Sequence, residues 1–348
     1  MAILEVSNLV KHFPVRGGLF NQTVGSVQAV NDVSLKVHRG ETVGIIGESG
    51  CGKSTLGKTL IRLLDPTSGR IWVEGIDITE LSHAEMMPFR RRMQFIFQDP
   101  YSSLNPRMTA AQMLGEVIRF HRVVPRHQVD GYIDELLQMV QLRHEYRDRY
   151  PHEFSGGQRQ RLNIARALAV KTEFIIANEP VSALDVSVQA QILNLLMDLR
   201  EKLGLTILFI SHDLKVVEHF CDRMIVMYLG TIAEEVSCDS LMTSVQHPYT
   251  QALLRSNPIN DPDDRHELYV LEGEVPSPRN PPAGCPFVTR CEKAEQKCHS
   301  DRPVLKETGK QHSVACWVVE NLHAASRQEK SQADSSAIGD SQQAVRPQ

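Results

Sequence analysis

The sequence has no long hydrophobic run. Its longest apolar stretches, residues 205–210 and 224–229, have about the length of a β-strand and fall far short of the roughly 18 residues that a membrane-spanning helix needs. The N-terminal segment also lacks the basic start, the apolar core and the small-residue cleavage site of a signal peptide. These absences predict a chain that does not cross a membrane by itself and stays in the cytoplasm.

An excess of positive charge is missing as well. The formal net charge is −4, so there is no overall basic field to hold nucleic acid or an anionic membrane through counterion release. We interpret the short arginine run at residues 90–92 as solvated helix surface, and we expect no nucleic-acid partner. Seven cysteines in a reducing compartment argue against a disulfide framework, which leaves metal binding or packing as their uses.

The chain does contain a series of short apolar segments. Runs rich in Val, Ile and Phe occur at residues 42–46, 93–97, 174–177, 205–210 and 224–228. Segments with helical spacing separate several of them, which predicts an α/β domain with a mainly parallel sheet. From about residue 99 this alternation stops. Helical spacing at 111–121 and 128–142 predicts a helical subdomain over about 99–165, inside a first domain of residues 1–245.

The composition changes beyond residue 245. Residues 246–320 are rich in proline and turn-forming residues and contain four of the seven cysteines, which predicts a small C-terminal unit. Residues 321–348 are polar and nearly free of large apolar side chains, so they cannot bury enough surface to offset the entropy of ordering. We expect a disordered tail there.

A glycine-rich loop follows the predicted strand at 42–46. It fits the pattern GxxxxGK followed by Ser or Thr, and it consists of Gly47, Glu48, Ser49, Gly50, Cys51, Gly52, Lys53 and Ser54, with Thr55 continuing into a helical segment. Glycines let backbone N–H groups turn towards phosphate oxygens, and the helix adds its positive end. Lys53 is expected to meet the β- and γ-phosphates of ATP, and Ser54 to bind Mg²⁺.

A second helix start that contains glycine lies further along the chain. It consists of Ser155, Gly156, Gly157 and Gln158, and it offers another anion-binding helix end. Taken alone, it could equally be a plain helix cap. The segments that follow it in order decide the matter, and they are Asn178-Glu179-Pro180 after a strand, then Ser182-Ala183-Leu184-Asp185, then Ile210-Ser211-His212-Asp213.

Together with Gln98 at the end of the strand 93–97, these motifs in this order resemble the ABC ATPase family over residues 3 to about 245. The resemblance implies a P-loop ABC ATPase cassette with a mainly parallel sheet, an antiparallel β part and a helical subdomain. It also implies that two cassettes pair head to tail, each ATP lying between the 47–55 loop of one subunit and the SGGQ segment of the other. Ser155 and Gly157 would then contact the γ-phosphate held by the partner.

The resemblance also implies roles for five single residues. Glu179 would polarise the attacking water, and His212 would hold that water, the γ-phosphate and Glu179 in register. Gln98 would sense Mg²⁺ and the water, Asp185 would bridge the two cassettes, and Phe13 would stack on adenine. Without the resemblance, an isolated Phe13 is more often a core residue, and an isolated His212 is usually packed or solvated.

One position departs from the family pattern. The family carries an acidic pair before the proline, whereas this chain has Asn178 before Glu179. The amide oxygen of Asn178 still accepts a hydrogen bond, but a charge-assisted contact is about twice as strong as a neutral one. We expect ATP to bind, while Mg²⁺ affinity and turnover at this site are in question. The alternative is a cassette that binds ATP and assembles the complex but hydrolyses poorly.

The C-terminal unit carries a resemblance of its own. Residues 246–317 are similar to the C-terminal extension of ATPase subunits of oligopeptide and dipeptide importers. This implies an ATPase on the cytoplasmic face of a bacterial cell membrane. Its implied partners are a second, related ATPase in a heterodimer, two transmembrane permease subunits and an extracytoplasmic solute-binding protein. Relatives also serve nickel, glutathione, opine or sugar import, so the cargo stays open.

Four cysteines of this unit are spaced by 5, 6 and 17 residues, and they are Cys285, Cys291, Cys298 and Cys316. The spacing lacks the paired CxxC knuckles of structural zinc sites, and four thiolates also suit an iron–sulfur cluster. The resemblance favours a [4Fe-4S] cluster, with zinc and unligated thiols as alternatives. The remaining expectations are surface positions for His299 and His312 and structural positions for Cys51, Cys221 and Cys238.

A soluble ABC factor that acts on DNA or ribosomes is a different class of protein. Such factors usually carry two cassettes in one chain, whereas this sequence has one GKS and one SGGQ segment and an importer-like extension. The sequence therefore favours a transporter subunit.

Overall fold

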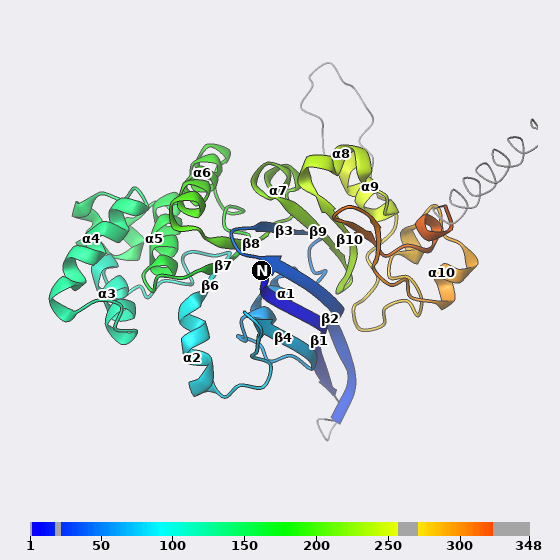
Figure 1. The fold of residues 1–348 in the computed structure, drawn as a ribbon, viewed down its shortest axis with the longest axis horizontal. Helices are drawn as coiled ribbons and strands as arrows, with labels where there is room; N and C mark the ends of the chain where they lie inside the picture. Colours follow the sequence, from blue (N-terminus) through cyan, green and yellow to red (C-terminus); the bar gives the residue numbers. More distant parts are fainter. Residues whose placement is uncertain (1, 18–21, 257–270, 323–348) are drawn as a thin grey trace, which may run out of the picture.

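The computed structural model describes residues 2–17, 22–256 and 271–322, and the predicted tail lies almost wholly outside this part of the chain. Two sheets form its centre (Figure 1). The larger sheet has eight strands in the order β11-β12-β10-β9-β3-β8-β7-β6, and the smaller one has four in the order β2-β1-β4-β5. Within the described ranges, no helix reaches the length and hydropathy that a membrane crossing requires.

The centre of the larger sheet consists of parallel strands. These are β3 (Thr42–Ile46), β6 (Met93–Ile96), β7 (Phe174–Asn178), β8 (Thr206–Ile210) and β9 (Arg223–Tyr228). Nearly every side chain in them is buried, as expected for a parallel sheet covered on both faces. The five apolar runs of the sequence therefore form strands, and the predicted mainly parallel sheet is confirmed.

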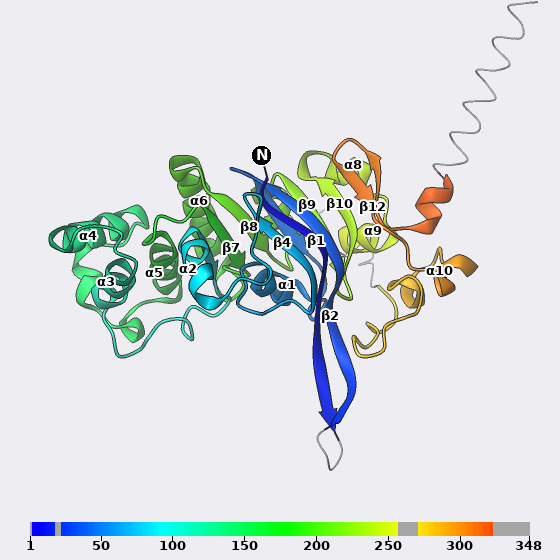
Figure 2. The same ribbon diagram turned by 60° about the horizontal axis from the view of Figure 1, so that its bottom comes forward.

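The antiparallel part is the smaller sheet. β1 (Ala2–Gly17) and β2 (Gln22–His38) form a long ribbon whose far end projects from the body in Figure 2, and β4 (Ser68–Val73) and β5 (Ile76–Asp77) continue from β1. Apolar side chains of this sheet pack in one cluster with α1 (Lys53–Leu60) and one face of the larger sheet. The smaller sheet thus covers the helix that follows the glycine-rich loop.

Helices occupy the interval between β6 and β7, at the left of Figure 1. They are α3 (Ala110–Phe120), η1 (Arg126–Gln128), α4 (Val129–Met139), η2 (His144–Asp148), η3 (Pro151–Glu153) and α5 (Gly156–Leu168). The two helices expected at 111–121 and 128–142 are confirmed, with slightly different ends. Three more helices flank the larger sheet, namely α2 (His83–Arg92), α6 (Val186–Leu203) and α7 (Leu214–Phe220).

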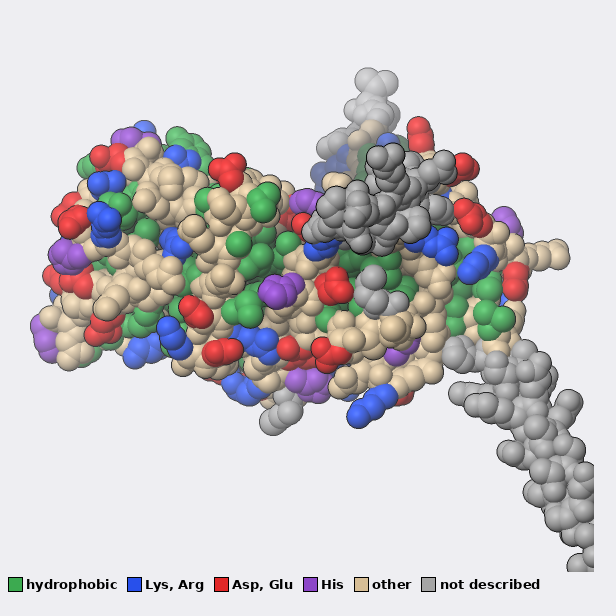
Figure 3. Space-filling view, turned by 90° about the horizontal axis from the view of Figure 1, so that it is seen from above, with side chains coloured by type: hydrophobic (Ala, Val, Ile, Leu, Met, Phe, Trp, Pro, Cys, Tyr) green, Lys and Arg blue, Asp and Glu red, His purple; other side chains and the backbone are tan. Residues whose placement is uncertain are grey.

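The arginine run at the end of α2 is less solvated than expected. Arg90, Arg91 and Arg92 are half-buried, and Nε of Arg92 lies 3.1 Å from Oε1 of Glu173. The run therefore anchors α2 to the sheet. Over the face shown in Figure 3, basic side chains are interspersed with acidic ones.

The C-terminal unit is joined to the larger sheet. β10 (Thr231–Ser237) pairs with β9 and with β12 (His312–Val314), and β11 (Lys306–Gly309) pairs with β12 at the sheet edge. Two short helices lie just before residue 245, namely η4 (Cys238–Ser240) and α8 (Leu241–Ser244). The helices of the unit itself are α9 (Pro248–Arg255), η5 (Val288–Arg290) and α10 (Gln296–Ser300). A sheet therefore crosses the expected boundary near residue 245, and the domain boundaries themselves stay predictions.

The surface position expected for His312 is wrong. His312 is buried, and its Nε2 lies 2.7 Å from Oε1 of Glu234, which is itself completely buried. Backbone N–H groups of Gln246 and His247 donate to the same carboxylate at 2.7 and 3.1 Å. A buried carboxylate needs such partners, and this requirement places His312 inside the unit. His299 is exposed, as expected.

Candidate functional site: a cavity at the carboxyl edge of the larger sheet

The glycine-rich loop joins β3 to α1. Gly47, Gly50 and Gly52 have φ values of 154°, 80° and 107°, a region that favours glycine. A Cβ atom at Gly47 would lie 2.2 Å from the carbonyl oxygen of Met227, and one at Gly52 would lie 2.0 Å from that of Ala29. Gly52 is also the N-cap of α1, and without a capping side chain the first N–H groups of the helix stay available to an anion.

Lys53 and Ser54 begin α1 and point back into the loop. The Lys53 ammonium is buried and donates to the carbonyl oxygens of Gly47 and Glu48 at 2.6 and 3.0 Å. The Ser54 hydroxyl donates to Oδ1 of Asn178 at 2.8 Å. The Lys53 ammonium is therefore held inside the loop, where the phosphates of ATP are predicted to lie.

Three polar side chains extend from the ends of neighbouring strands. Glu179 follows β7, Gln98 lies just beyond β6 and His212 just beyond β8, and the carboxyl ends of parallel strands meet at one edge of a sheet. Nε2 of Gln98 donates to Oε2 of Glu179 at 2.8 Å, and Nδ1 of His212 lies 3.3 Å from the same oxygen. Glu179 has φ 47°, an uncommon conformation that clusters at functional sites. The structure brings these residues together, and their catalytic roles stay predictions.

The loop and these side chains surround one cavity of about 580 Å³. Its lining consists of Phe13, Val27, Ala29, Ser49, Gly50, Gly52, Lys53, Ser54, Thr55, Gln98, Glu179, His212 and Pro278. Phe13 on β1 thus lies beside the same space as the predicted phosphate site. Pro278 comes from the C-terminal unit and was not predicted. Its carbonyl oxygen accepts from the N–H of Gln28 at 2.9 Å, and no spacing pattern marks a lone proline that reaches a cavity from so distant a segment.

The SGGQ segment is not part of this lining. Ser155 caps α5, because its Oγ accepts from the N–H of Gln158 at 3.3 Å and its own N–H donates to Oε1 of Gln158 at 3.0 Å. Ser155 and Gly156 are exposed, Gly157 is half-buried, and Asp185 is exposed at the start of α6. The residues predicted to contact a partner cassette therefore remain accessible.

Asn178 is the last residue of β7 and only 4% exposed. Of the three predicted Mg²⁺ ligands, Ser54 and Asn178 contact each other, whereas Gln98 is bonded to Glu179. Asn178 offers a neutral oxygen where the family pattern has a carboxylate. It therefore lies beside Ser54, the serine predicted to bind Mg²⁺, and offers a weaker acceptor than a carboxylate would.

The four C-terminal cysteines lie in one region. Cys285 and Cys298 are buried, Cys291 and Cys316 are half-buried, and the N–H of Cys285 donates to the carbonyl oxygen of Cys298 at 2.8 Å. Burial first, with the charges of the other three thiolates adding to it, raises the pKa of Cys285 to about 12. The described residues nevertheless contain no group of three or more His, Cys, Asp or Glu side chains placed to hold a metal ion. The geometry therefore lends the predicted metal site no support.

The other three cysteines are packed thiols, as expected. Cys51, Cys221 and Cys238 are buried within apolar clusters. Burial raises the pKa of each thiol, that of Cys238 to about 12.

Two family models match the chain. The model described as ABC transporter matches residues 30–182, and the one described as oligopeptide/dipeptide transporter, C-terminal region, matches residues 233–298. A probable peptide ABC transporter ATP-binding protein of Sinorhizobium fredii is 53% identical over 91% of this chain and 90% of its own length. The oligopeptide transport ATP-binding protein AppF of Bacillus subtilis is 50% identical, over 90% of this chain and 96% of its own length.

Solved structures lead to the same family. The dimeric post-hydrolysis state of the ATP-binding cassette MJ0796, bound to ADP and Pi, gives a TM-score of 0.60 at 30% identity and covers 68% of this chain and 98% of that chain. The cbiO1 protein of Clostridium perfringens, part of an ABC transporter complex, gives 0.60 at 27% identity, with 70% and 91% covered. By sequence and by fold, this chain belongs to the family of ABC transporter ATP-binding proteins and has the ATPase cassette of that family.

Proposed function

We propose that the chain hydrolyses ATP to energise a peptide importer, as one of two cassettes on the cytoplasmic face of a bacterial cell membrane. The observation that carries the proposal is the cavity of about 580 Å³, in which the glycine-rich loop and the Glu179, Gln98 and His212 side chains face one space. The C-terminal family match and the names of the relatives support peptides as the cargo.

The glycine-rich loop would bind the phosphates of ATP. In the structure the Lys53 ammonium is bound by neutral carbonyl oxygens, and the charged oxygens of the β- and γ-phosphates are stronger acceptors for it. Backbone N–H groups at the start of α1 would add the helix's positive end. Bound Mg²⁺ would neutralise phosphate charge, with the Ser54 hydroxyl and the Gln98 and Asn178 amide oxygens as the side chains placed to hold it or its water.

Glu179 would activate the attacking water. As the water oxygen bonds to the γ-phosphorus, its proton passes to the Glu179 carboxylate, and the bond to the leaving oxygen of ADP breaks. Gln98 already donates to Oε2 of Glu179, and this bond fixes the carboxylate's direction. The His212 ring lies 3.3 Å from the same carboxylate and lines the cavity, where it would meet a γ-phosphate.

A second cassette would complete the site. Ser155 and Gly157 lie outside the cavity and stay accessible, which supports their contact with ATP bound by a partner. Asp185, exposed at the start of α6, would bridge the two cassettes. The second cassette is proposed to be a related ATPase in a heterodimer, working with two transmembrane permease subunits and an extracytoplasmic solute-binding protein. Gln98 would pass closure to the permeases through the helical subdomain of about 99–165.

Lys53→Ala tests the ATP site. The variant should lose roughly 100-fold or more in ATP affinity, about 3 kcal/mol, because no other side chain of the loop carries positive charge. Lys58→Ala is the matched control, since Lys58 lies on the same helix but outside the cavity lining. Affinity is measured by fluorescent-nucleotide titration of the full chain. Wild-type affinity in Lys53→Ala would remove the site assignment.

The cargo is tested in the assembled transporter. Peptides loaded on the solute-binding protein should stimulate ATP hydrolysis, whereas nickel, glutathione, opines or sugars should not. Stimulation by one of these solutes instead would replace peptides as the cargo while leaving the ATPase assignment in place. A poorly hydrolysing cassette is the second candidate function, and it rests on the neutral amide of Asn178 beside Ser54.

An iron–sulfur cluster at the four C-terminal cysteines is proposed on the chemistry of its donors alone, since four thiolates can ligate such a cluster. Protein purified without oxygen should then be brown and contain iron and sulfide. A colourless anaerobic preparation with one equivalent of zinc would replace the cluster by a four-cysteine zinc site. A preparation without metal would leave packed thiols.

A further inference from the structure

The C-terminal unit touches the phosphate-binding loop at Glu48. The Arg290 guanidinium forms two bonds with this carboxylate, Nη1 to Oε2 at 2.7 Å and Nη2 to Oε1 at 3.1 Å. The Arg290 side chain is 5% exposed and that of Glu48 27% exposed. A bidentate pair with a buried guanidinium is among the strongest and most directional of side-chain contacts.

The backbone of Glu48 is held as well. Its N–H donates to the hydroxyl of Tyr249 at 2.9 Å, and Tyr249 is a completely buried residue of α9. Its carbonyl oxygen accepts from the Lys53 ammonium. Glu48, the second residue of the loop, is therefore bound at its side chain and its N–H by the C-terminal unit, and at its carbonyl by the lysine of the loop.

An aromatic cluster places Arg290. The rings of Tyr228, Tyr249 and Phe287 lie 4.7 to 5.3 Å apart. Phe287 is the N-cap of η5, the turn that ends at Arg290, and its carbonyl oxygen accepts the N–H of Arg290 at 3.1 Å. The backbone carbonyl of Glu272 accepts from Nε of Arg290 at 3.2 Å. The guanidinium is thus aimed by packed rings and backbone bonds before it meets Glu48.

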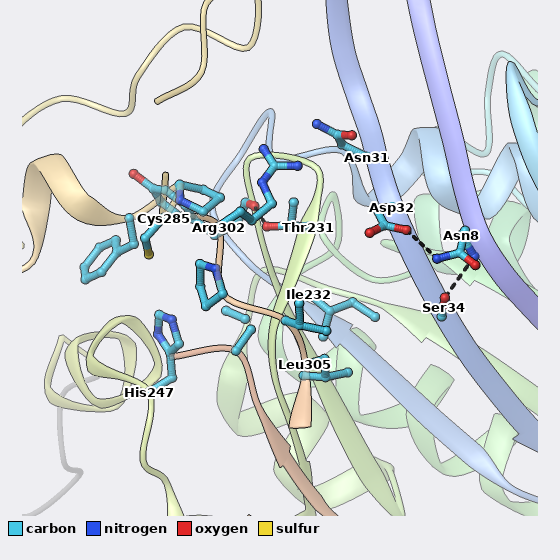
Figure 4. A pocket seen from close by; sticks show the side chains of 17 residues that line it. Asn8, Asn31, Asp32, Ser34, Thr231, Ile232, His247, Cys285, Arg302 and Leu305 are labelled. Atoms are coloured by element: carbon cyan, nitrogen blue, oxygen red, sulfur yellow. Dashed lines mark hydrogen bonds between the residues drawn. The ribbon is translucent and has the colours of Figure 1, made fainter. Parts of the chain in front are cut away.

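The C-terminal unit is less closely packed against the smaller sheet than against the loop. A second cavity, of about 430 Å³, separates the C-terminal unit from the strands of the smaller sheet (Figure 4). Cys285, His247 and Arg302 lie on one side of it, and Asn8 and Asp32 lie on the strands opposite, bonded to each other at 2.7 Å. The polar residues on these strands already have hydrogen-bond partners within the smaller sheet, since Asn31 donates to Gln28 and Ser34 accepts from the N–H of Asn8. The tight contact is the one at the phosphate loop.

Charge gives this contact a function in ATP binding. Glu48 is the one acidic residue among residues 47–55, and an unpaired carboxylate there would repel the anionic phosphates. The ion pair with Arg290 neutralises the Glu48 carboxylate and keeps it outside the cavity. The cavity lining includes the adjacent Ser49 and Gly50 but not Glu48. Both effects favour a loop whose N–H groups face the phosphates.

We propose that Arg290 is a positioning residue for ATP: the C-terminal unit uses its guanidinium to hold Glu48, and with it the phosphate-binding loop, in the shape that accepts the phosphates. The inference rests on the proposed ATP site. It makes the C-terminal unit a determinant of nucleotide affinity in this chain.

The test compares three variants of the full chain. Arg290→Met removes the charge and should raise the dissociation constant for ATP roughly tenfold. Arg290→Lys should recover part of this loss, because lysine keeps the charge but not the paired N–H donors that bind both carboxylate oxygens. Lys306→Met is the matched control, since it removes an exposed ion pair with Glu320 elsewhere in the same unit. In the assembled transporter, Arg290→Met should raise KM for ATP with kcat near wild type. Unchanged ATP affinity in Arg290→Met would overturn the proposal.

If Arg290→Met folds poorly, Arg290→Lys carries the test, because it keeps the charge and should still bind ATP less tightly than wild type. Where Arg290→Met does fold, a double-mutant cycle shows whether its effect passes through Glu48. In a Glu48→Gln background, Arg290→Met should cause no further loss of ATP affinity, because its target charge is gone. Losses that simply add would show that Arg290 acts elsewhere. Lys53→Ala separates the two proposals: if it binds ATP normally, the ATP site is wrong, whereas if it fails and Arg290→Met binds normally, only the role of Arg290 is wrong.

Discussion

The nucleotide cavity differs in the burial of its side chains from the junction beside it, the contact between the C-terminal unit and the loop that includes Arg290, Tyr249, Phe287 and His247. In the cavity, His212 is 58% exposed and Gln98 is exposed, although both contact Glu179. In the junction, Phe287 is 3% exposed, Tyr249 is completely buried and the Arg290 side chain is 5% exposed. The side chains that would reach a γ-phosphate or a second cassette from outside the glycine-rich loop are left accessible, whereas Lys53 and the groups that shape the loop are enclosed. Substitutions in the first region should therefore change function with little effect on folding, and substitutions in the second should change stability in addition to any effect on ATP binding.

Glu179→Gln gives the largest expected effect on the cavity side. The amide cannot accept the proton of the attacking water, so turnover at this site should fall roughly 100-fold or more. ATP affinity and the melting temperature should stay near wild type, since the substitution preserves shape and the phosphate loop is untouched. ATPase is measured in the assembled transporter, with the partner's equivalent glutamate also replaced. Unchanged hydrolysis would place water activation on another residue.

Phe287→Ala is the corresponding change in the junction. Removing a buried ring that packs against Tyr228 and Tyr249 should cost about 3–5 kcal/mol of unfolding free energy. Phe120→Ala is the matched control, because Phe120 on α3 is 68% exposed and its loss should change stability by no more than about 0.5 kcal/mol. Chemical denaturation of both variants checks the difference. Equal effects would erase the distinction between the two regions.

The sequence predicted the cavity far better than the junction. Strands of the parallel sheet are buried on both faces, so they appear as continuous apolar runs, and the residues that end them follow directly in the chain. Gln98, Glu179 and His212 could therefore be found as motifs and placed at one edge. For these residues, the position in the sequence, directly after a buried strand, already determines the position in the fold.

The junction leaves no comparable mark in the sequence. The ion pair between Glu48 and Arg290 joins residues 242 positions apart, and neither residue stands in a pattern that names the other. Pro278 in the cavity lining and the burial of His312 were missed for the same reason. Like the pairing of β12 with β10, these contacts join segments far apart in the chain, and the turn-rich sequence between 246 and 320 does not reveal them.

His247 should make the stability of the junction depend on pH. Its ring is buried in the junction, where Nδ1 accepts the N–H of Tyr249 at 3.0 Å, and burial lowers its pKa to about 4. Since the unfolded chain binds a proton near pH 6.5 and the folded one does not, the free energy of unfolding should fall as pH drops from 6.5 towards 4. Between pH 7.5 and 5 this amounts to about 2 kcal/mol.

His247→Asn should remove that part of the pH dependence. Asparagine is a good N-cap and offers an acceptor for the same N–H, but it does not titrate. Urea unfolding of both proteins at the two pH values isolates the histidine, because the other titrating groups are shared. Parallel loss of stability in the two proteins would mean that His247 takes up its proton in the folded state as well.

Asn178→Asp is the smallest expected change and lies on the cavity side. The Ser54 hydroxyl, a predicted Mg²⁺ ligand, donates to Oδ1 of Asn178 at 2.8 Å, so a carboxylate here would meet the ion or its water with charge. Replacing a neutral acceptor by a charged one corresponds to about 1 kcal/mol, or several-fold in apparent affinity. The variant should reach half-maximal ATPase at a lower Mg²⁺ concentration and turn over faster.

The comparison for Asn178 must be made in the assembled transporter, because the isolated chain lacks the SGGQ segment of a partner. Asn178→Ala tests the opposite change, because it removes the acceptor for the Ser54 hydroxyl. This variant should need more Mg²⁺ than wild type for half-maximal ATPase. If the three proteins rank Asp, Asn, Ala in the Mg²⁺ they require, the amide is a weakened but working part of the ion site. If their Mg²⁺ profiles coincide, Ser54, Gln98 and water already satisfy the ion, and the poorly hydrolysing cassette loses the observation that favours it.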